Sequence, residues 1–171
     1  KAMIEWSKTS WFLDESAMSA DEILPGGKPS LPKFWRLGSR PNLKQMHNDA
    51  LTRVPQELVE FKLVDAIRNL KSLTSGASAL GARVHNLPQK PSDIQDDGDF
   101  HYAVLGPQAA SMSGKPSAEA RAFIEETTGS DKPRVYRNAV VLAVPSRDGL
   151  ELARDRIREY LAWEDVREEL I

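Results

Sequence analysis

The stretch Ala-Val-Val-Leu-Ala-Val at residues 139–144 constrains the fold of this chain more than any other feature. Successive side chains of a β-strand point to opposite faces, so a strand that is apolar at every position is expected in a sheet with both faces covered. Strand-like residues at 100–105 and a helical pattern at 117–128 precede it, and an amphipathic pattern follows at 150–163. This order predicts a parallel pair, strands 100–105 and 138–144, joined by a right-handed helical crossover.

The same half of the chain contains a further strand pattern at residues 83–87. In the last helix, apolar side chains recur at helical spacing and are expected to pack on the sheet, with Trp163 sealing that contact. The predicted fold class is therefore α/β, with a small mixed or parallel sheet that helices cover. The side chains expected to face the sheet are Leu150, Ala153, Ile157, Tyr160 and Leu161.

Two helices are expected before this sheet. Residues 56–73 place apolar side chains three and four positions apart, Pro55 suits the first turn, and Gly76 suits the end of the helix. A shorter helix at 43–52 is separate because Pro55 disfavours helical geometry at Val54. The two helices are predicted to form a helical hairpin.

Aromatic residues characterise the start of the chain. Short aromatic runs at 10–13 and 34–37 are separated by a stretch rich in proline and glycine, which predicts a β-hairpin with a long connection. We expect a β-hairpin arm at 1–41, a helical hairpin at 42–75 and an α/β subdomain at 76–171, together forming one compact unit. Because the chain starts with Lys1 and ends within a helical pattern, we expect a piece of a larger protein.

Composition narrows the class of protein. The fractions of apolar (40%) and charged (28%) residues are typical of a globular domain. The chain has no cysteine, which excludes disulfides and thiolate metal sites and predicts a reducing compartment such as the cytoplasm. No apolar run approaches the about 20 residues of a membrane span. A net charge of -2 offers no general attraction to nucleic acid, so DNA or RNA binding would need a local basic patch.

Several sequence motifs that bind phosphate or metal are incomplete in this chain. The turns at residues 26–30 and 114–117 contain Gly-Lys but lack the glycine spacing and helix start of a phosphate loop. The acidic stretch 93–99 begins like a calcium loop, but Val104 occupies the position that requires a bidentate glutamate. We favour a solvated turn there over an irregular calcium or magnesium site.

Catalytic groups are equally incomplete. The three histidines show no paired ligand spacing, and no serine has the surroundings of an activated nucleophile. The sequence therefore predicts no catalytic residue and no metal ligand within this segment.

Two groups of polar and basic residues remain as candidates for binding an anion or a phosphate. One group lies between the second aromatic run and the first helix, where free backbone N–H groups also favour anions. The other precedes strand 138–144, where planar guanidinium groups can hold a phosphate with two hydrogen bonds. The competing interpretation, which we favour, is that these side chains pair with the chain's own acidic residues. The candidates are Arg36, Arg40 and Lys44 in the first group and Arg134, Arg137 and Asn138 in the second.

Four segments, at residues 34–43, 92–97, 133–141 and 159–163, resemble the large predicted AAA+ superfamily ATPases of bacteria and archaea. These proteins are often encoded near restriction-modification and phage-defence genes. The resemblance extends from Trp11 to Trp163, and its most specific part is Pro-Arg-Val-Tyr-Arg-Asn followed by Tyr-Leu-Ala-Trp. It implies that the nucleotide-binding motifs lie upstream, in an ATPase core of the same protein. It transfers no catalytic residue to this segment.

The resemblance leads to an expectation about function. The chain is expected to be an accessory, non-catalytic domain of an AAA+-like ATPase that couples nucleotide state to a partner or a neighbouring subunit. ATP and magnesium would belong to the parent protein and not to this segment. The alternative is a module that contacts DNA or RNA through a local basic patch.

Overall fold

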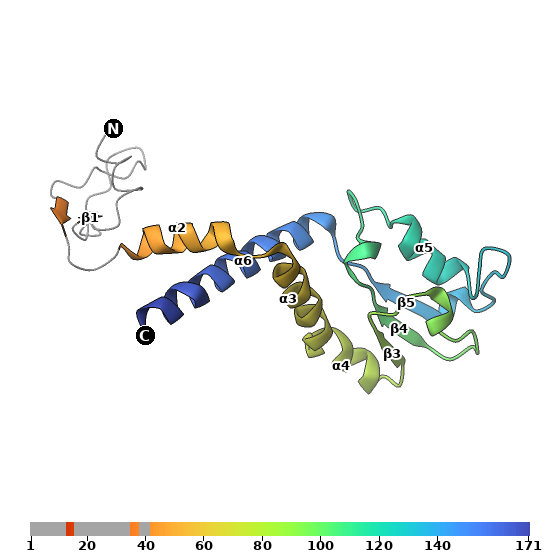
Figure 1. Ribbon diagram of the computed structural model, residues 1–171. Coiled ribbons are helices and arrows are strands. Elements are labelled where there is room, and N and C mark those ends of the chain that lie inside the picture. The colour runs from red at the N-terminus through yellow and green to blue at the C-terminus, as the bar shows by residue number, and fades with distance from the viewer. Residues whose placement is uncertain (1–12, 16–34, 38–41) are drawn as a thin grey trace, which may run out of the picture. The chain divides into compact units, whose positions relative to one another are not determined.

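The computed structural model describes residues 13–15, 35–37 and 42–171 (Figure 1). The chain divides into two compact units. Unit 2 comprises Pro55–Ile157, and unit 1 comprises the residues up to Val54 together with Arg158–Ile171. This division differs from the predicted segments because one helix, α6 (Arg147–Leu170), contributes its first part to unit 2 and its second part to unit 1.

A parallel three-stranded sheet forms the centre of unit 2 (Figure 1). Its strands are β3 (Arg83–Asn86), β4 (His101–Val104) and β5 (Val140–Ala143), in that order across the sheet. Strands β4 and β5 pair in parallel, as the sequence predicts, and β3 pairs in parallel with β4. The predicted α/β fold class with a small parallel sheet is therefore confirmed.

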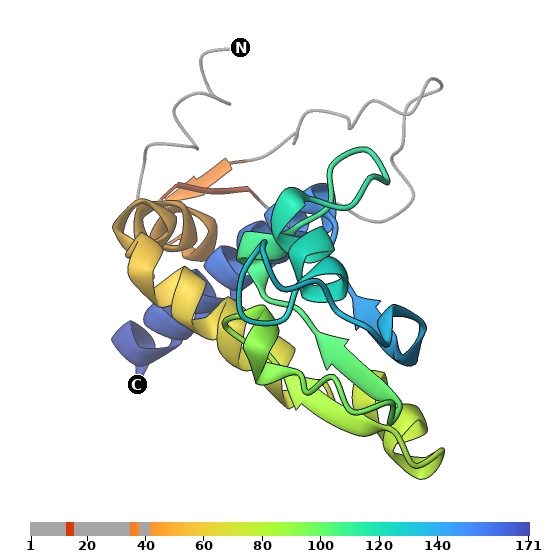
Figure 2. The ribbon, with the colours of Figure 1, turned by 90° about the vertical axis from the view of Figure 1, so that its right-hand side faces the viewer.

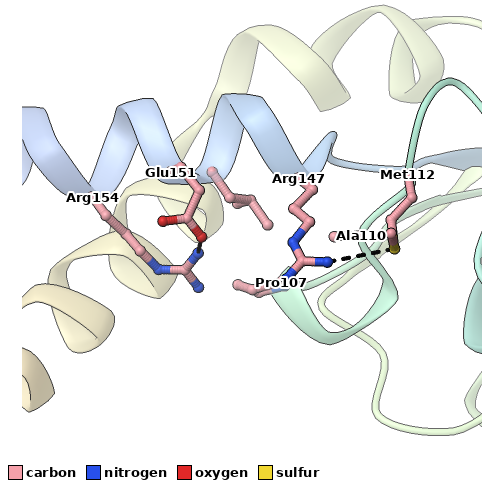
Figure 3. Close-up of a pocket in the computed structure, with 7 residues that line it drawn as sticks. Pro107, Ala110, Met112, Arg147, Glu151 and Arg154 are labelled. Atoms are coloured by element: carbon pink, nitrogen blue, oxygen red, sulfur yellow. Dashed lines mark hydrogen bonds and ion pairs between the residues drawn. The ribbon is translucent and has the colours of Figure 1, made fainter.

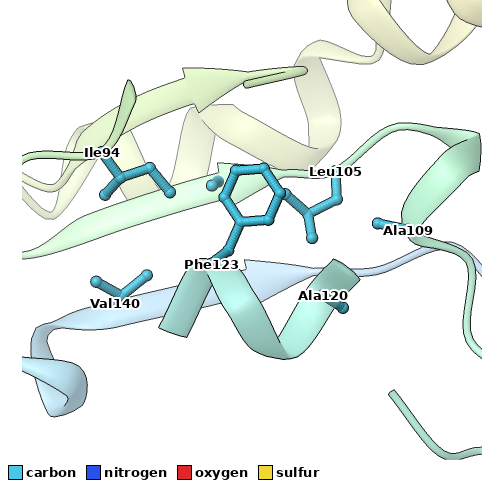
Figure 4. Packing of buried hydrophobic residues seen from close by; sticks show 7 residues of the cluster. Ile94, Leu105, Ala109, Ala120, Phe123 and Val140 are labelled. Atoms are coloured by element: carbon cyan, nitrogen blue, oxygen red, sulfur yellow. The ribbon is translucent and has the colours of Figure 1, made fainter. Parts of the chain in front are cut away.

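One face of the sheet packs against helix α5 (Ala118–Glu125), which follows β4 in the chain (Figure 2). The Ser117 side chain caps this helix by accepting a hydrogen bond from the Ala120 N–H at 3.1 Å. Phe123 projects from α5 into the cluster of buried side chains that fills this face (Figure 4). Burying a side chain of this size contributes about 1.5–3 kcal/mol. The cluster consists of Ile94, Ala103, Leu105, Ala109, Ala120, Phe123 and Val140.

The opposite face is covered over the central strand but not over its neighbour. Val104 alternates with Ala103 along β4 and is also buried, so β4 is enclosed on both faces. Val141 of β5 is 53% exposed. The prediction that the apolar run 139–144 is covered on both faces is therefore wrong at this position, because β5 lies at the edge of the sheet.

Before the sheet, the predicted helix 56–73 is two helices, α3 (Gln56–Asn69) and α4 (Lys71–Ala79). Leu70 breaks the helical geometry between them, with φ -73° and ψ 74°. Gly76 does not end the helix as predicted and instead lies inside α4. The chain turns at Gly81, whose φ of +82° is the left-handed conformation that glycine adopts readily. Helix α4 packs against β3 and β4.

Unit 1 contains helix α2 (Leu43–Arg53) and the second part of α6. The Asn42 side chain caps α2 by accepting a hydrogen bond from the Lys44 N–H at 3.0 Å. The helix ends at Val54, whose extended conformation before Pro55 agrees with the prediction. The two helices bury a cluster formed by Met46, Ala50, Ala162 and Val166.

The amino-terminal hairpin is described only in part. Strands β1 (Leu13–Glu15) and β2 (Trp35–Leu37) pair antiparallel, with Asp14 opposite Arg36. The rest of the predicted aromatic runs and their connection lie outside the described residues. Among the helices of the described ranges, none has the length and apolarity needed to span a membrane.

Candidate functional site

The first predicted basic group is only partly described. Arg36 lies in β2, Lys44 lies exposed in the first turn of α2, and Arg40 lies outside the described residues. Whether these three cations form one patch therefore stays a prediction.

Arg134 of the second group is buried, with only 2% of its surface exposed. Its guanidinium donates to four main-chain carbonyls, which uses four of the five N–H groups that an arginine has. Burial lowers the pKa of Arg134, while the nearby Asp96 carboxylate acts in the opposite direction. The carbonyls belong to Pro91, Ile94, Gln95 and Phe123, so this side chain ties α5 to the loop before β4 and is not open to a phosphate.

The carboxylate of Asp96 binds the two main-chain N–H groups that follow Arg134 in the sequence. Its two carboxylate oxygens accept hydrogen bonds from the N–H groups of Val135 at 2.7 Å and Tyr136 at 2.9 Å. Burial acts to raise the pKa of Asp96, but these two hydrogen bonds and the charge of Arg134 together leave the pKa below its ordinary value. Two adjacent N–H groups of this kind are a typical anion site, and here the chain's own carboxylate fills it.

Two other carboxylates of the acidic stretch 93–99 also accept hydrogen bonds from main-chain N–H groups. Asp93 accepts hydrogen bonds from the N–H groups of Gln89 and Lys90, and Asp97 accepts one from its neighbour Asp99. The hydrogen bond from the Gln89 N–H is the largest cause that lowers the pKa of Asp93, followed by the one from the Lys90 N–H. No group of three or more acidic or histidine side chains in the described residues has the arrangement of a metal site. These carboxylates organise the loop by accepting hydrogen bonds within the chain.

Arg137 and Asn138 differ from Arg134 in being exposed. They begin a short 3-10 helix, η3 (Arg137–Ala139), and Arg137 donates from Nε to the Arg134 carbonyl at 3.2 Å. The structure thus separates the second predicted group into one buried structural arginine and two exposed residues.

A shallow pocket that the sequence did not reveal lies where β4 and β5 end (Figure 3). Its volume is about 280 Å³. It forms between the residues after β4 and the first turns of α6, at the carboxyl edge of parallel strands, where α/β proteins commonly bind ligands. The residues that line it are Pro107, Ala110, Met112, Arg147, Leu150, Glu151 and Arg154.

The two arginines of this pocket differ in their partners. Arg154 forms two hydrogen bonds with the Glu60 carboxylate, at 2.6 and 3.1 Å, and one with Glu151 at 2.9 Å. The hydrogen bond that Arg154 donates to Glu60 is the largest cause that raises the pKa of Arg154. Arg147 lies 3.5 Å from the Met112 sulfur, which is a weak acceptor. The guanidinium of Arg147 is therefore better placed than that of Arg154 to bind an acidic group in the pocket.

Sequence reasoning missed Arg147 because it placed the start of the last helix at Leu150. A usable signal was present: Ser146 is a favoured capping residue, and its Oγ accepts a hydrogen bond from the Gly149 N–H at 3.1 Å. Arginines at 147 and 154, seven positions apart, then fall on one face of that helix.

Comparisons of this chain with protein-family models, with curated proteins and with solved structures gave no match.

Proposed function

We propose that this chain is an accessory domain of an AAA+-like ATPase, which passes nucleotide-dependent motion from one part of the protein to a partner or a neighbouring subunit. One structural observation carries the proposal: the single helix α6 belongs to both compact units. The sequence resemblance supplies the class of the parent protein.

Each part of α6 is fixed to its own unit. In unit 2, Leu150 is buried, and Arg154 is held by the Glu60 carboxylate of α3. In unit 1, Ala162 and Val166 pack into the cluster that α2 shares. Helix α6 is therefore a continuous element of 24 residues with contacts in each unit, through which a displacement in one unit would reach the other.

The charged side chains of unit 2 support an accessory role. Arg134, Asp96 and Asp97 hold loops in place through hydrogen bonds within the chain. The pocket at the carboxyl edge of the sheet offers Arg147 at the first turn of α6. An acidic group from a partner that binds there would act directly on the helix that the two units share.

A break in α6 tests this coupling. Arg156→Pro interrupts the helix just before the boundary between the units, whereas Arg156→Ala changes the same side chain and keeps a good helix former. Urea unfolding is followed by two probes in each protein: the indole N–H resonance of Trp163 for unit 1 and the amide resonances of Ala103 and Val104 for unit 2.

Coincident transitions are expected in the wild type and in Arg156→Ala, and separated transitions in Arg156→Pro. Separated transitions in the wild type would contradict coupling through α6, and so would coincident transitions in a folded Arg156→Pro variant.

A further inference from the structure

Two histidines that are 16 positions apart in the sequence meet on one face of the sheet. His85 of β3 and His101 of β4 have their rings joined by a hydrogen bond, with 2.9 Å between His85 Nε2 and His101 Nδ1. The parallel register explains the meeting, because Arg83 lies opposite His101 and His85 opposite Ala103, which places both histidines on the same face.

The pair is anchored at its inner end. His101 is 2% exposed, and its Nε2 lies 3.0 Å from the Asp97 carboxylate. The hydrogen bond from His101 is the largest cause that lowers the pKa of Asp97, to about 2. Asp97 is therefore ionised near neutral pH and can only accept, so His101 carries its proton on Nε2. His101 Nδ1 is then an acceptor, and His85 donates to it from Nε2.

This arrangement limits how many protons the pair can hold. One added proton is tolerated: His101 then donates from Nδ1, and His85 accepts after moving its own proton to Nδ1. A second added proton would place two N–H groups opposite each other within a 2.9 Å hydrogen bond. The doubly protonated pair is therefore incompatible with the observed contact between β3 and β4.

Charged groups on the neighbouring elements interact with the histidine pair or with the carboxylate that binds it. Arg83 of β3 binds the carboxylates of Asp97 at 2.6 Å and Asp99 at 2.5 Å. Asp93, from the short 3-10 helix η1 (Pro91–Asp93), favours protonation of His85, and Arg134, from the segment before η3, opposes it. Burial is the largest cause that lowers the pKa of His85, followed by His101 and Arg83.

We propose that His85 and His101 form a pH-sensitive latch that holds β3 to β4 near neutral pH and releases this edge strand when both rings are protonated. Strand β3 is short and lies at the edge of the sheet, so its loss leaves β4 and β5 paired.

The direction of the pH dependence follows from His85. Its pKa in the folded chain is below the ordinary value of 6.5, so the unfolded chain binds more protons between these two values. The contribution of neutral His85 to the stability of the fold is therefore complete above its ordinary pKa and decreases as the pH falls through that value. Asp97 titrates only at a much lower pH and does not interfere in this range.

Amide hydrogen exchange between about pH 7.5 and about pH 5 tests the latch. The protection factors of Val84 and His85, which correct for the intrinsic pH dependence of exchange, are compared with those of Val141 and Leu142. In the wild type, β3 protection is expected to decrease by up to about tenfold per pH unit for each proton taken up on opening, while β5 protection is retained. Equal protection of β3 at both ends of this range would overturn the proposal.

His85→Gln separates the latch from simple packing. The glutamine amide can donate to His101 Nδ1 but cannot take up a proton in this range, so β3 protection should no longer depend on pH. His47→Gln, which alters the histidine of unit 1, should keep the wild-type dependence. Two results would contradict the latch. One is a wild-type pH dependence of β3 protection in folded His85→Gln, and the other is the loss of this dependence in His47→Gln.

A direct measurement on the wild-type protein does not depend on any variant. The 13C resonances of the His85 imidazole should show a midpoint of protonation below the ordinary histidine pKa. A midpoint for His85 at or above the ordinary histidine pKa would refute the latch.

Discussion

The imidazole of His47 stacks on the indole of Trp163, with ring centroids 4.2 Å apart and 20° between the ring planes. The contact joins α2 to the second part of α6 within unit 1. Trp163 was predicted to seal the helix against the sheet. The structure instead gives it a partner in α2 and leaves it 48% exposed.

The stacked pair should contribute measurably to the stability of unit 1. A double-mutant cycle with His47→Ala and Trp163→Ala is expected to give a coupling energy of about 0.5–1.5 kcal/mol, as aromatic pairs do. Urea unfolding of the four proteins measures it. Additivity of the two single changes would show that the rings merely lie next to each other.

His47→Phe offers a matched variant of this pair. It keeps an aromatic ring on Trp163 and removes His47 Nε2, a buried atom without a hydrogen-bond partner in the described structure. Stability equal to or above that of the wild type is expected, because burying an unpaired polar atom costs free energy. A loss greater than that caused by His47→Ala would contradict this interpretation.

Arg134 and Arg137 should respond very differently to the same substitution. Arg134→Met leaves four carbonyls without their donor and should lower the free energy of unfolding by roughly 3–5 kcal/mol. Arg137→Met removes one hydrogen bond from an exposed side chain and should cost no more than about 1 kcal/mol. Chemical denaturation distinguishes them; equal effects would mean that the buried guanidinium does not hold the loop.

Acid should destabilise the chain in part through Asp97. The pKa of Asp97 is about 2 in the folded chain and has an ordinary value of 3.8, so its contribution is complete above the ordinary value and is lost as the pH falls toward the folded value. Asp97→Asn should therefore flatten the dependence of stability on pH in this window. Thermal unfolding at a series of pH values measures it, and an unchanged slope in the variant would contradict the assignment.

The cap of α5 should be worth about 1 kcal/mol. Ser117 accepts from the Ala120 N–H and donates to the Ala109 carbonyl at 3.0 Å, so Ser117→Ala removes both hydrogen bonds. Ser117→Thr retains a hydroxyl group and should be close to the wild type. Urea unfolding checks the pair, and equal losses in the two variants would indicate a steric effect rather than the loss of the cap.

The sequence predicted the sheet well where local pattern determines structure. The apolar run around Val140 and the crossover helix carrying Phe123 were sufficient to predict the parallel pairing of β4 and β5. The exposure of Val141 was not predictable, because it depends on which strand lies at the edge, and strand order is a property of the whole fold.

The candidate site was harder to predict because its determinants lie far apart in the chain. Arg134 contacts the Ile94 carbonyl, 40 positions away, and His85 meets His101 only through the parallel register. Neither contact leaves a short-range pattern, so the sequence offers the arginine only as a candidate anion ligand or as a partner of the chain's own acidic residues, and it leaves the histidines unconnected. Arg147 was missed because its helix begins three residues earlier than its apolar periodicity suggests.

The function that we propose for this chain, an accessory domain, requires that nucleotide binds elsewhere in the parent protein. Isothermal titration of the chain with ATP and magnesium tests this requirement. No saturable binding is expected at nucleotide concentrations up to about the millimolar range. A dissociation constant in the micromolar range would contradict it and would place a nucleotide site within this chain.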